Sequence, residues 1–228
     1  HGPEAGEQAW TDALDSLACL AEDEEWTGLS ASRSPLLILN QYLRYTYQRL
    51  AMEKKIKVSE DGEYASFNTG LLTRHSEEIF GFFQRNKAAN AQPWFFLRWA
   101  TESDRDIMRF FPEAPQLAEY FLSAGDLVYD WRRELKFNFE HILGDNIDRF
   151  PQELQDSPAR ARSALVSAAD LTLKRVRRNY KLIVPQWYPN LGEDGSGFFM
   201  PLDLLHTGTT DLALVVSTVG ERTYRAHT

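Results

Sequence analysis

Three extended apolar runs near the end of the sequence constrain the fold most strongly. They are Leu182–Tyr188, Phe198–Leu205 and Leu212–Val219. The connections between them contain Gly and Asp and are too short for the crossover that joins parallel strands. We therefore expect three consecutive antiparallel strands in one sheet. A further run, Thr223–His227, ends without a cap or a polar tail, so we expect the natural protein to continue past Thr228.

Helical periodicity appears in two long segments. After Ser34-Pro35, which reads as a helix start, apolar residues recur every three or four positions and predict a helix that ends near residue 55. The same signal at Ser157-Pro158 opens a stripe that runs to Tyr180 and predicts a second long helix. Shorter helices are predicted in three other segments, namely 7–22, Ser103–Phe111 and Leu117–Leu122.

Further strands are predicted in the first half of the chain. Asp61-Gly62 lies between two apolar runs and is typical of a hairpin turn. Apolar and aromatic runs at 79–83 and 93–99 indicate two more strands, and alternation at 135–139 indicates an extended segment. The predicted fold class is α+β, with a largely antiparallel sheet and two long helices packed on it.

Charge is distributed unevenly along the chain. The net charge is −8, and residues 1–32 contain eight acidic residues and no Lys or Arg. Subtracting these eight from the 33 acidic residues leaves 25, which equals the 25 Lys and Arg of the remainder. We therefore predict a peripheral acidic N-terminal segment, 1–32, and a single α+β domain, 33–228. Within that domain, residues 158–181 hold seven basic residues and one Asp, which is compatible with a phosphate-binding face.

Composition excludes several classes of protein. Cys19 is the only cysteine, so neither an internal disulfide nor a cysteine-based zinc site is expected, and the cytoplasm is the predicted compartment. No apolar run approaches the length of about 18 residues that a membrane span needs, so no membrane is expected as a partner. The five His residues show no metal-ligand spacing, and no metal is predicted. The sequence contains none of the common phosphate-loop, dinucleotide, serine-hydrolase or zinc-protease motifs. The cofactor and the oligomeric state stay open.

The first polar cluster follows a predicted hairpin strand. Asn68, Thr69 and Gly70 offer short donors and backbone N–H groups, and Arg74 is placed to grip a phosphate. The alternative is an ordinary turn in which Asn68 and Thr69 bond their own backbone.

The second polar cluster lies in residues 140–151, which show no clear helical period. His141 is the natural proton carrier near neutral pH, and Asn146 and Arg149 are candidate ligand contacts. The alternative is a structural segment in which His141 and Arg149 tie a helix to the sheet.

The third polar cluster closes the second long helix. At about 100° per residue, Lys174, Arg177, Arg178 and Lys181 fall on one face. This face is either a phosphate or RNA contact or a solvated helix end stabilised by the helix dipole. The residues that follow add further candidate ligand contacts, which are Asn179, Tyr180, Gln186 and Trp187.

The chain resembles an uncharacterised bacterial domain family, also found in some fungi, over residues 35–228. The matching landmarks include Phe67–Leu71 (FNTGL), Glu140–Leu143 with Asn146 and Arg149–Pro151, Arg178–Lys181 with Val184–Gln186, Met200–Leu202 and Asp211–Val216. Domains of this family stand beside cold-shock and OST-type helix-turn-helix modules, so the resemblance implies an RNA context. It also implies that family members continue past the end of this chain, which would leave its last strand unpaired. The resemblance implies no activity.

Three functions follow from these observations. The first is an RNA- or nucleotide-binding domain that uses a basic, aromatic-lined pocket. The second is a phosphodiesterase acting on RNA ends or nucleotides, in which His141 is the acid or base and Lys181 stabilises the developing charge. The third is a protein-interaction domain regulated by the acidic segment 1–32.

Overall fold

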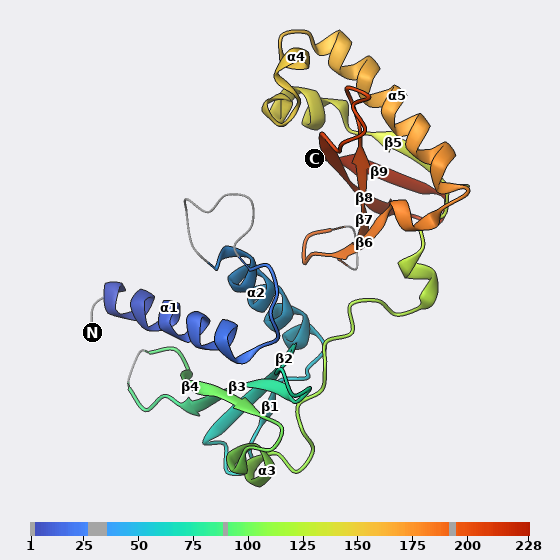
Figure 1. Ribbon diagram of the computed structural model, residues 1–228. Helices are drawn as coiled ribbons and strands as arrows, with labels where there is room; N and C mark the ends of the chain where they lie inside the picture. The colour runs from blue at the N-terminus through green and yellow to red at the C-terminus, as the bar shows by residue number, and fades with distance from the viewer. Residues whose placement is uncertain (1–2, 27–35, 89–90, 192–194) are drawn as a thin grey trace. The chain divides into compact units, whose positions relative to one another are not determined.

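The computed structural model describes residues 3–26, 36–88, 91–191 and 195–228, and their side chains from Gly6 onward. The chain divides into two compact units, of which unit 1 is His1–Glu119 and unit 2 is Tyr120–Thr228. Each unit has its own sheet and core (Figure 1). This division does not coincide with the boundary expected after residue 32, and the single domain over 33–228 stays a prediction.

Unit 1 is built on a four-stranded antiparallel sheet. Its strands are adjacent in chain order, namely β1 (Lys57–Val58), β2 (Tyr64–Leu72), β3 (Glu78–Arg85) and β4 (Trp94–Thr101). The hairpin predicted at Asp61-Gly62 joins β1 to β2, and Gly62 supplies the positive φ of 71° that the turn requires.

Helices cover both faces of this sheet. Figure 1 shows α1 (Pro3–Leu20) and α2 (Leu37–Met52) on one face and the short α3 (Arg105–Phe110) on the other. Alternation along β3 explains why both faces are buried, because Ile79 packs on the side of α1 and α2 whereas Phe80 and Phe82 pack against α3.

The acidic segment is less peripheral than its charge predicts. Leu14, Leu17, Ala21 and Trp26 are buried in the core of unit 1, so this part of the segment that was predicted to be peripheral packs within the folded unit. An amphipathic helix buries its apolar stripe even when its other face is acidic. One of the acidic side chains, Asp23, accepts a hydrogen bond from Arg74 at 2.7 Å.

Unit 2 is built on a five-stranded sheet in the order β5-β9-β8-β7-β6. The bounds of these strands are β5 (Glu134–Phe137), β6 (Val184–Trp187), β7 (Ser196–Leu202), β8 (Leu212–Val219) and β9 (Thr223–His227). The antiparallel neighbours β6, β7 and β8 confirm the prediction made from the three apolar runs. The last strand is not unpaired, because β9 pairs antiparallel with β8 and parallel with β5.

One long helix packs against this second sheet. In α5 (Pro158–Val176), Ala161, Leu165 and Ala169 are buried in the same core as Met200 and Leu214 of the sheet. The remaining elements of unit 2 are short, namely the 3-10 turns η1 (Ala124–Leu127), η3 (Ile147–Arg149) and η4 (Tyr180–Leu182), the π-helix η2 (Glu140–Asp145) and α4 (Gln152–Gln155).

The α+β class is confirmed, but its details differ from the prediction. The described residues form two sheets rather than one, and three helices of seven or more residues rather than two long helices. Leu117–Leu122 is irregular rather than helical, and its apolar side chains are exposed or half-buried, so no buried stripe stabilises a helix there. Asp104 rather than Ser103 caps α3, since its side chain accepts from Asp106 N. The predicted helix start at Ser34-Pro35 lies outside the described residues.

Candidate functional site

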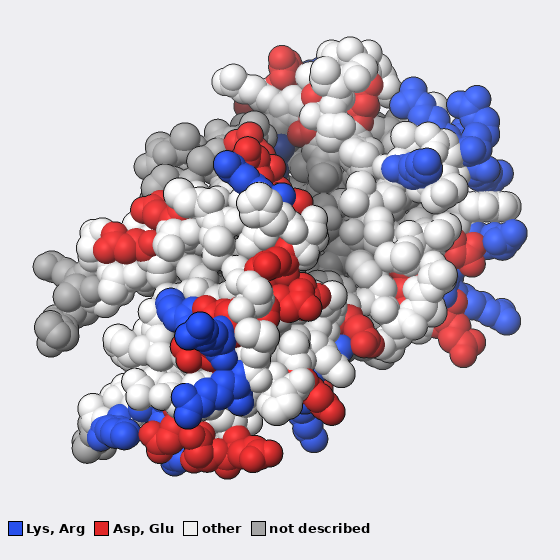
Figure 2. Space-filling model, turned by 60° about the horizontal axis from the view of Figure 1, so that its bottom comes forward, with Lys and Arg blue, Asp and Glu red and all other residues white. Residues whose placement is uncertain are grey.

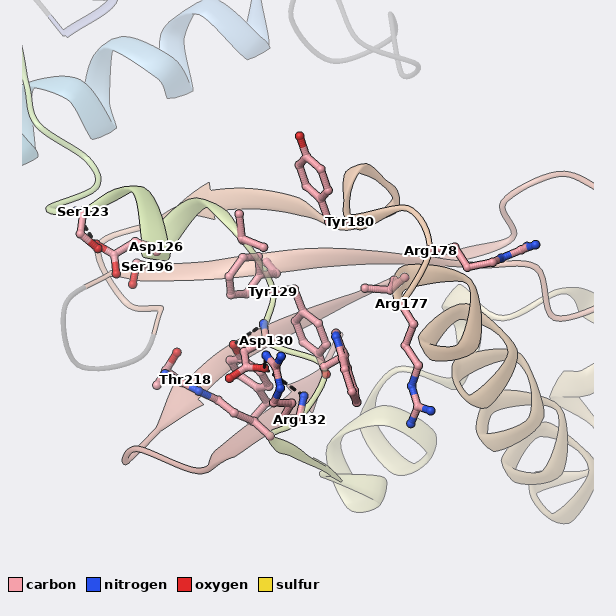
Figure 3. A pocket seen from close by; sticks show the side chains of 17 residues that line it. Ser123, Asp126, Tyr129, Asp130, Arg132, Arg177, Arg178, Tyr180, Ser196 and Thr218 are labelled. Carbon is pink, nitrogen blue, oxygen red and sulfur yellow. Dashed lines mark hydrogen bonds and ion pairs between the residues drawn. The ribbon is translucent and has the colours of Figure 1, made fainter.

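A cavity of about 680 Å³ lies at one end of the sheet of unit 2 (Figure 3). Four parts of the unit line it: the segment from η1 to β5, the turn after α5, the start of β7, and the facing positions of β8 and β9. Elements that are distant in sequence therefore meet around one hollow on a rigid sheet, which is a common place for a ligand site.

The floor of the cavity is aromatic. The ring of Tyr129 stacks on that of Tyr224 at 4.6 Å between centroids, and Phe198 meets Tyr129 edge-on at 5.6 Å. Tyr129 is 2% exposed, and its hydroxyl has no hydrogen-bond partner among the described residues. Burial raises the pKa of Tyr129, so this hydroxyl stays protonated and remains a donor. A buried donor without a partner is costly, and a ligand that accepts from it removes that cost.

The rim of the cavity is basic and aromatic. The guanidinium carbon of Arg132 lies 4.9 Å from the ring centre of Trp131, and that of Arg177 lies 4.6 Å from the same ring. Arg133 lies over Tyr224 at 5.1 Å. Cation–π contacts hold these flexible side chains near the aromatic surface without neutralising their charge.

Two carboxylates also line the cavity. Asp130 Oδ1 accepts from the backbone N of Arg132 at 3.0 Å and from its Nη1 at 3.4 Å. Asp126 Oδ2 accepts from the backbone N of Ser123 at 2.8 Å and of Leu122 at 3.0 Å. The carboxylates therefore order the loop, and the four arginines that line the cavity exceed them by two positive charges.

The third predicted cluster contributes Arg178 and Tyr180 to the cavity lining. The prediction that this helix runs to about Tyr180 is wrong, because α5 ends at Val176 and Lys181 lies in the separate turn η4. In Figure 3, Arg132 lies against Asp130, whereas Arg178 and Tyr180 extend away from that pair. Figure 2 shows Lys and Arg side chains gathered at the right of the view, the side on which α5 ends in Figure 1.

The other residues of the third cluster have local roles or stand apart. Asn179 caps η4 by accepting from the backbone N of Lys181. Lys181 is exposed and Gln186 is half-buried, and neither lines the cavity. Trp187 is not available for stacking on a base, because it is 7% exposed and packs against Tyr120 at 5.5 Å.

The second predicted cluster lies apart from the cavity lining. His141 Nδ1 is 3.2 Å from Asp145 Oδ2, and its Nε2 is 3.0 Å from the carbonyl oxygen of Thr228. Asn146 Nδ2 donates to the carbonyl oxygen of His141 at 2.7 Å, within the turn that follows the π-helix. Arg149 is exposed. These contacts link η2 to Thr228, the residue after β9, through His141 but not through Arg149, so they match the structural alternative only in part.

A pH-dependent stability follows from the histidine pair in this cluster. The His227 ring lies 6.0 Å from that of His141, and burial, with the positive charges of His141 and Arg225, lowers the pKa of His227. The folded state therefore favours neutral His227. Its stabilising contribution is complete above the unfolded pKa of about 6.5 and is lost as the pH falls below that value. We expect the His227→Gln variant to lose less stability than the wild type between pH 7 and about pH 5 in urea unfolding. The exposed His75→Gln control should show the wild-type loss.

The first predicted cluster belongs to unit 1 and is largely internal. Asn68 Nδ2 donates to Glu78 Oε2 at 3.0 Å and to the carbonyl oxygen of Pro115 at 3.1 Å, and Asn68 Oδ1 accepts from Gly70 N at 2.9 Å. Thr69 Oγ1 donates to the carbonyl oxygen of Ile79 at 2.7 Å.

A structural requirement also explains the glycine of the FNTGL motif. Gly70 has a φ of 78°, and a Cβ atom there would lie 2.6 Å from the hydroxyl oxygen of Tyr42. Arg74, the phosphate candidate, is exposed and paired with Asp23. Asn68, Thr69 and Gly70 lie within β2 rather than in the ordinary turn of the structural alternative. Asn68 and Thr69 bond neighbouring backbone N–H groups, as that alternative predicts, but they also bond β3 and Pro115.

Sequence reasoning missed Trp131, Arg132 and Arg133. The signal was present in the sequence, since an aromatic residue followed by two arginines combines a stacking surface with phosphate-binding charge. It was missed because residues 123–133 show no periodicity that assigns them to a helix or a strand. Within the described ranges, no group of three His, Cys, Asp or Glu side chains is arranged to hold a metal. No described helix is both long and apolar enough to cross a membrane.

Comparison with known proteins identifies the family to which the chain belongs. Residues 17–228 match a family described as a domain of unknown function, DUF3825. No curated protein and no solved structure matches the chain. The match spans both compact units, so the cavity of unit 2 lies within the matched region.

Proposed function

Because the chain belongs to the DUF3825 family, an uncharacterised domain family, we propose its function from the site itself: the cavity of unit 2 binds RNA or a nucleotide. The observation that carries the proposal is the grouping of Arg132, Arg133 and Arg177 around the exposed ring of Trp131, above a buried aromatic floor. We name this group of residues the arginine cavity.

The arginines suit the phosphate part of such a ligand. A guanidinium keeps its charge at every physiological pH and offers a planar set of donors that matches two phosphate oxygens. Arg132 has a side chain 73% exposed, so a bound phosphate reaches it without any rearrangement of the core. The excess of arginines over carboxylates gives the cavity the sign of charge that attracts a polyanion.

The aromatic residues suit the base. Trp131 is 39% exposed and Tyr180 is 56% exposed, and both line the cavity. Exposed rings beside cations form the stacking surface that single-stranded nucleic acid uses. The protonated Tyr129 hydroxyl supplies a buried donor for a ribose or base oxygen. The volume of about 680 Å³ falls within the range of nucleotide-sized ligand sites.

The sequence resemblance supports RNA rather than a free nucleotide. The FNTGL motif and its companion landmarks resemble bacterial and fungal domains that stand beside cold-shock and OST-type helix-turn-helix modules. That association carries less weight than the geometry, since a fold or a neighbour does not define a function.

Hydrolysis is not part of the proposal. His141 does not line the arginine cavity, and both of its ring nitrogens already lie within hydrogen-bonding distance of Asp145 and Thr228. A general base needs a free nitrogen within reach of the proton that it removes.

The test is the double variant Arg132→Gln with Arg177→Gln. Binding of a fluorescein-labelled single-stranded RNA of about ten nucleotides is measured by anisotropy over a salt series. Loss of two phosphate contacts is expected to weaken binding by at least about tenfold and to reduce the salt slope by about 1.4.

The matched control is Arg160→Gln. Arg160 is an exposed arginine near the N-terminal end of α5, the helix that Arg177 caps at its other end, and it does not line the cavity. It should bind RNA as the wild type does. Equal affinity in the double variant and the control would refute the proposal.

A further inference from the structure

Unit 1 contains a second cavity, of about 580 Å³, between its helices and the sheet face that they cover. Trp10 of α1 and the exposed side of α2 form one wall. Side chains of β2, β3 and β4 that point toward the same helices form the other. We name this hollow the aromatic cavity. It shares no lining residue with the arginine cavity.

The wall of the aromatic cavity is preformed. Tyr47 meets Phe67 edge-on at 5.5 Å between centroids, Phe67 lies 5.7 Å from Phe83, and Phe83 meets Phe96 at 5.5 Å. Trp10 continues the series at 6.1 Å from Phe96. Rings that hold one another by such contacts keep their positions when a ligand is absent, so little ordering is required on binding.

Large aromatic side chains remain exposed at this cavity although they lie beside a core. Trp10 is 37% exposed and Tyr47 is 44% exposed. Apolar surface left in water is unfavourable, and a flat ligand that covers both rings removes that surface from solvent. The aromatic lining therefore favours a planar ring system over an aliphatic chain.

The polar residues of the lining indicate which functional group the planar ligand carries. Asn40 is already engaged, since its Oδ1 accepts from Trp10 Nε1 at 3.0 Å. Arg44 is exposed, and no ion pair joins it to an acidic side chain within the described part of the chain. The lining includes no Asp or Glu. A single cation without a competing acid at the edge of an apolar hollow selects an anionic group.

We propose that the aromatic cavity binds a small planar aromatic molecule that carries one anionic group. The ring system lies against Phe67, Phe83 and Phe96, and the anion pairs with Arg44. Gln48 and Gln92 line the same cavity and supply amide donors and acceptors beside Arg44. This site is independent of the RNA proposal, because it rests on other residues in the other unit.

The test uses two fluorescent probes and the full chain. 1-Anilinonaphthalene-8-sulfonate carries one sulfonate on a planar naphthalene ring, and N-phenyl-1-naphthylamine is its neutral counterpart. Both probes should bind saturably at one site per chain. In the Arg44→Gln variant the dissociation constant of the anionic probe should rise about tenfold, while that of the neutral probe should stay within about twofold. The exposed Arg105→Gln variant, outside the lining, should change neither.

A second variant tests the location. Gln48→Trp fills the mouth of the aromatic cavity from an already half-buried position on α2 and should abolish binding of both probes. Circular dichroism and the thermal midpoint check that this variant is folded, and the Arg44→Gln result stands without it. Equal weakening of both probes in Arg44→Gln would mean an apolar docking surface without anion recognition and would overturn the proposal. Binding of the anionic probe that persists unchanged in both variants would overturn it as well.

Discussion

Replacing Asn68 with alanine is expected to destabilise unit 1 by about 2–4 kcal/mol. Asn68 is 1% exposed, and its side-chain amide makes the three hydrogen bonds described above, to Glu78, Pro115 and Gly70. Alanine removes all three and leaves the carbonyl oxygen of Pro115 and the N–H of Gly70 without these partners. The cost of unpaired buried polar groups exceeds the net gain of a typical hydrogen bond, which is why we expect a large effect.

Ser66 provides a matched control on the same strand. It is also fully buried, but its hydroxyl has no hydrogen-bond partner among the described residues. Ser66→Ala removes a buried polar group without orphaning another, so it should be neutral or stabilising. Urea unfolding, with hydrogen exchange of the β2 and β3 amides, assigns either change to unit 1.

The result decides what the FNTGL motif is for. A destabilised Asn68→Ala variant that retains RNA affinity while folded indicates a structural motif. If the variant has wild-type stability but weakened RNA binding, Asn68 contacts the ligand and the structural interpretation is wrong.

The strands were predictable from sequence where local pattern and tertiary structure agree. Leu212–Val219 is a mostly apolar run of eight residues, a length that is typical of a strand and short for a helix, and β8 has the same bounds. The turn at Asp61-Gly62 was equally readable, because a positive φ favours glycine. Helix ends were less readable. α5 ends at Val176, four residues before the apolar stripe ends at Tyr180, since the chain turns there into η4.

Two features depend on contacts that no local pattern reveals. Nothing in the spacing of apolar residues indicates that β9 inserts between β5 and β8, because the partner strands lie in different parts of the sequence. Likewise, the third cluster was predicted as a helix face, but Arg178 lies in the turn after α5 and lines the cavity from there. Arg132 also lines the cavity, and it lies in a segment without helix or strand periodicity. The residues that line the cavity come from separate parts of the sequence. Arg178 and Tyr180 are among the candidates that the sequence predicts, whereas Trp131 is not.

Replacing Trp131 with alanine is expected to weaken binding of single-stranded RNA by about 10- to 100-fold. The variant loses a stacking surface, and base–aromatic stacking contributes about 1–3 kcal/mol per base. It also releases two guanidinium groups, because Arg132 and Arg177 both lie over the Trp131 ring. Freed arginine side chains must be ordered again when a phosphate binds, and that lost entropy adds to the effect.

The salt dependence separates this variant from the arginine variants. Trp131→Ala keeps every positive charge, so the slope of log affinity against log salt should stay close to that of the wild type while affinity falls at all salt concentrations. Trp131→Phe retains a ring and should recover most of the affinity. The control is Phe95→Ala, which removes a 57% exposed ring of unit 1 that lines neither cavity. If Trp131→Ala binds RNA no more weakly than this control, bases do not stack in the arginine cavity, and any RNA held there is bound through its phosphates alone.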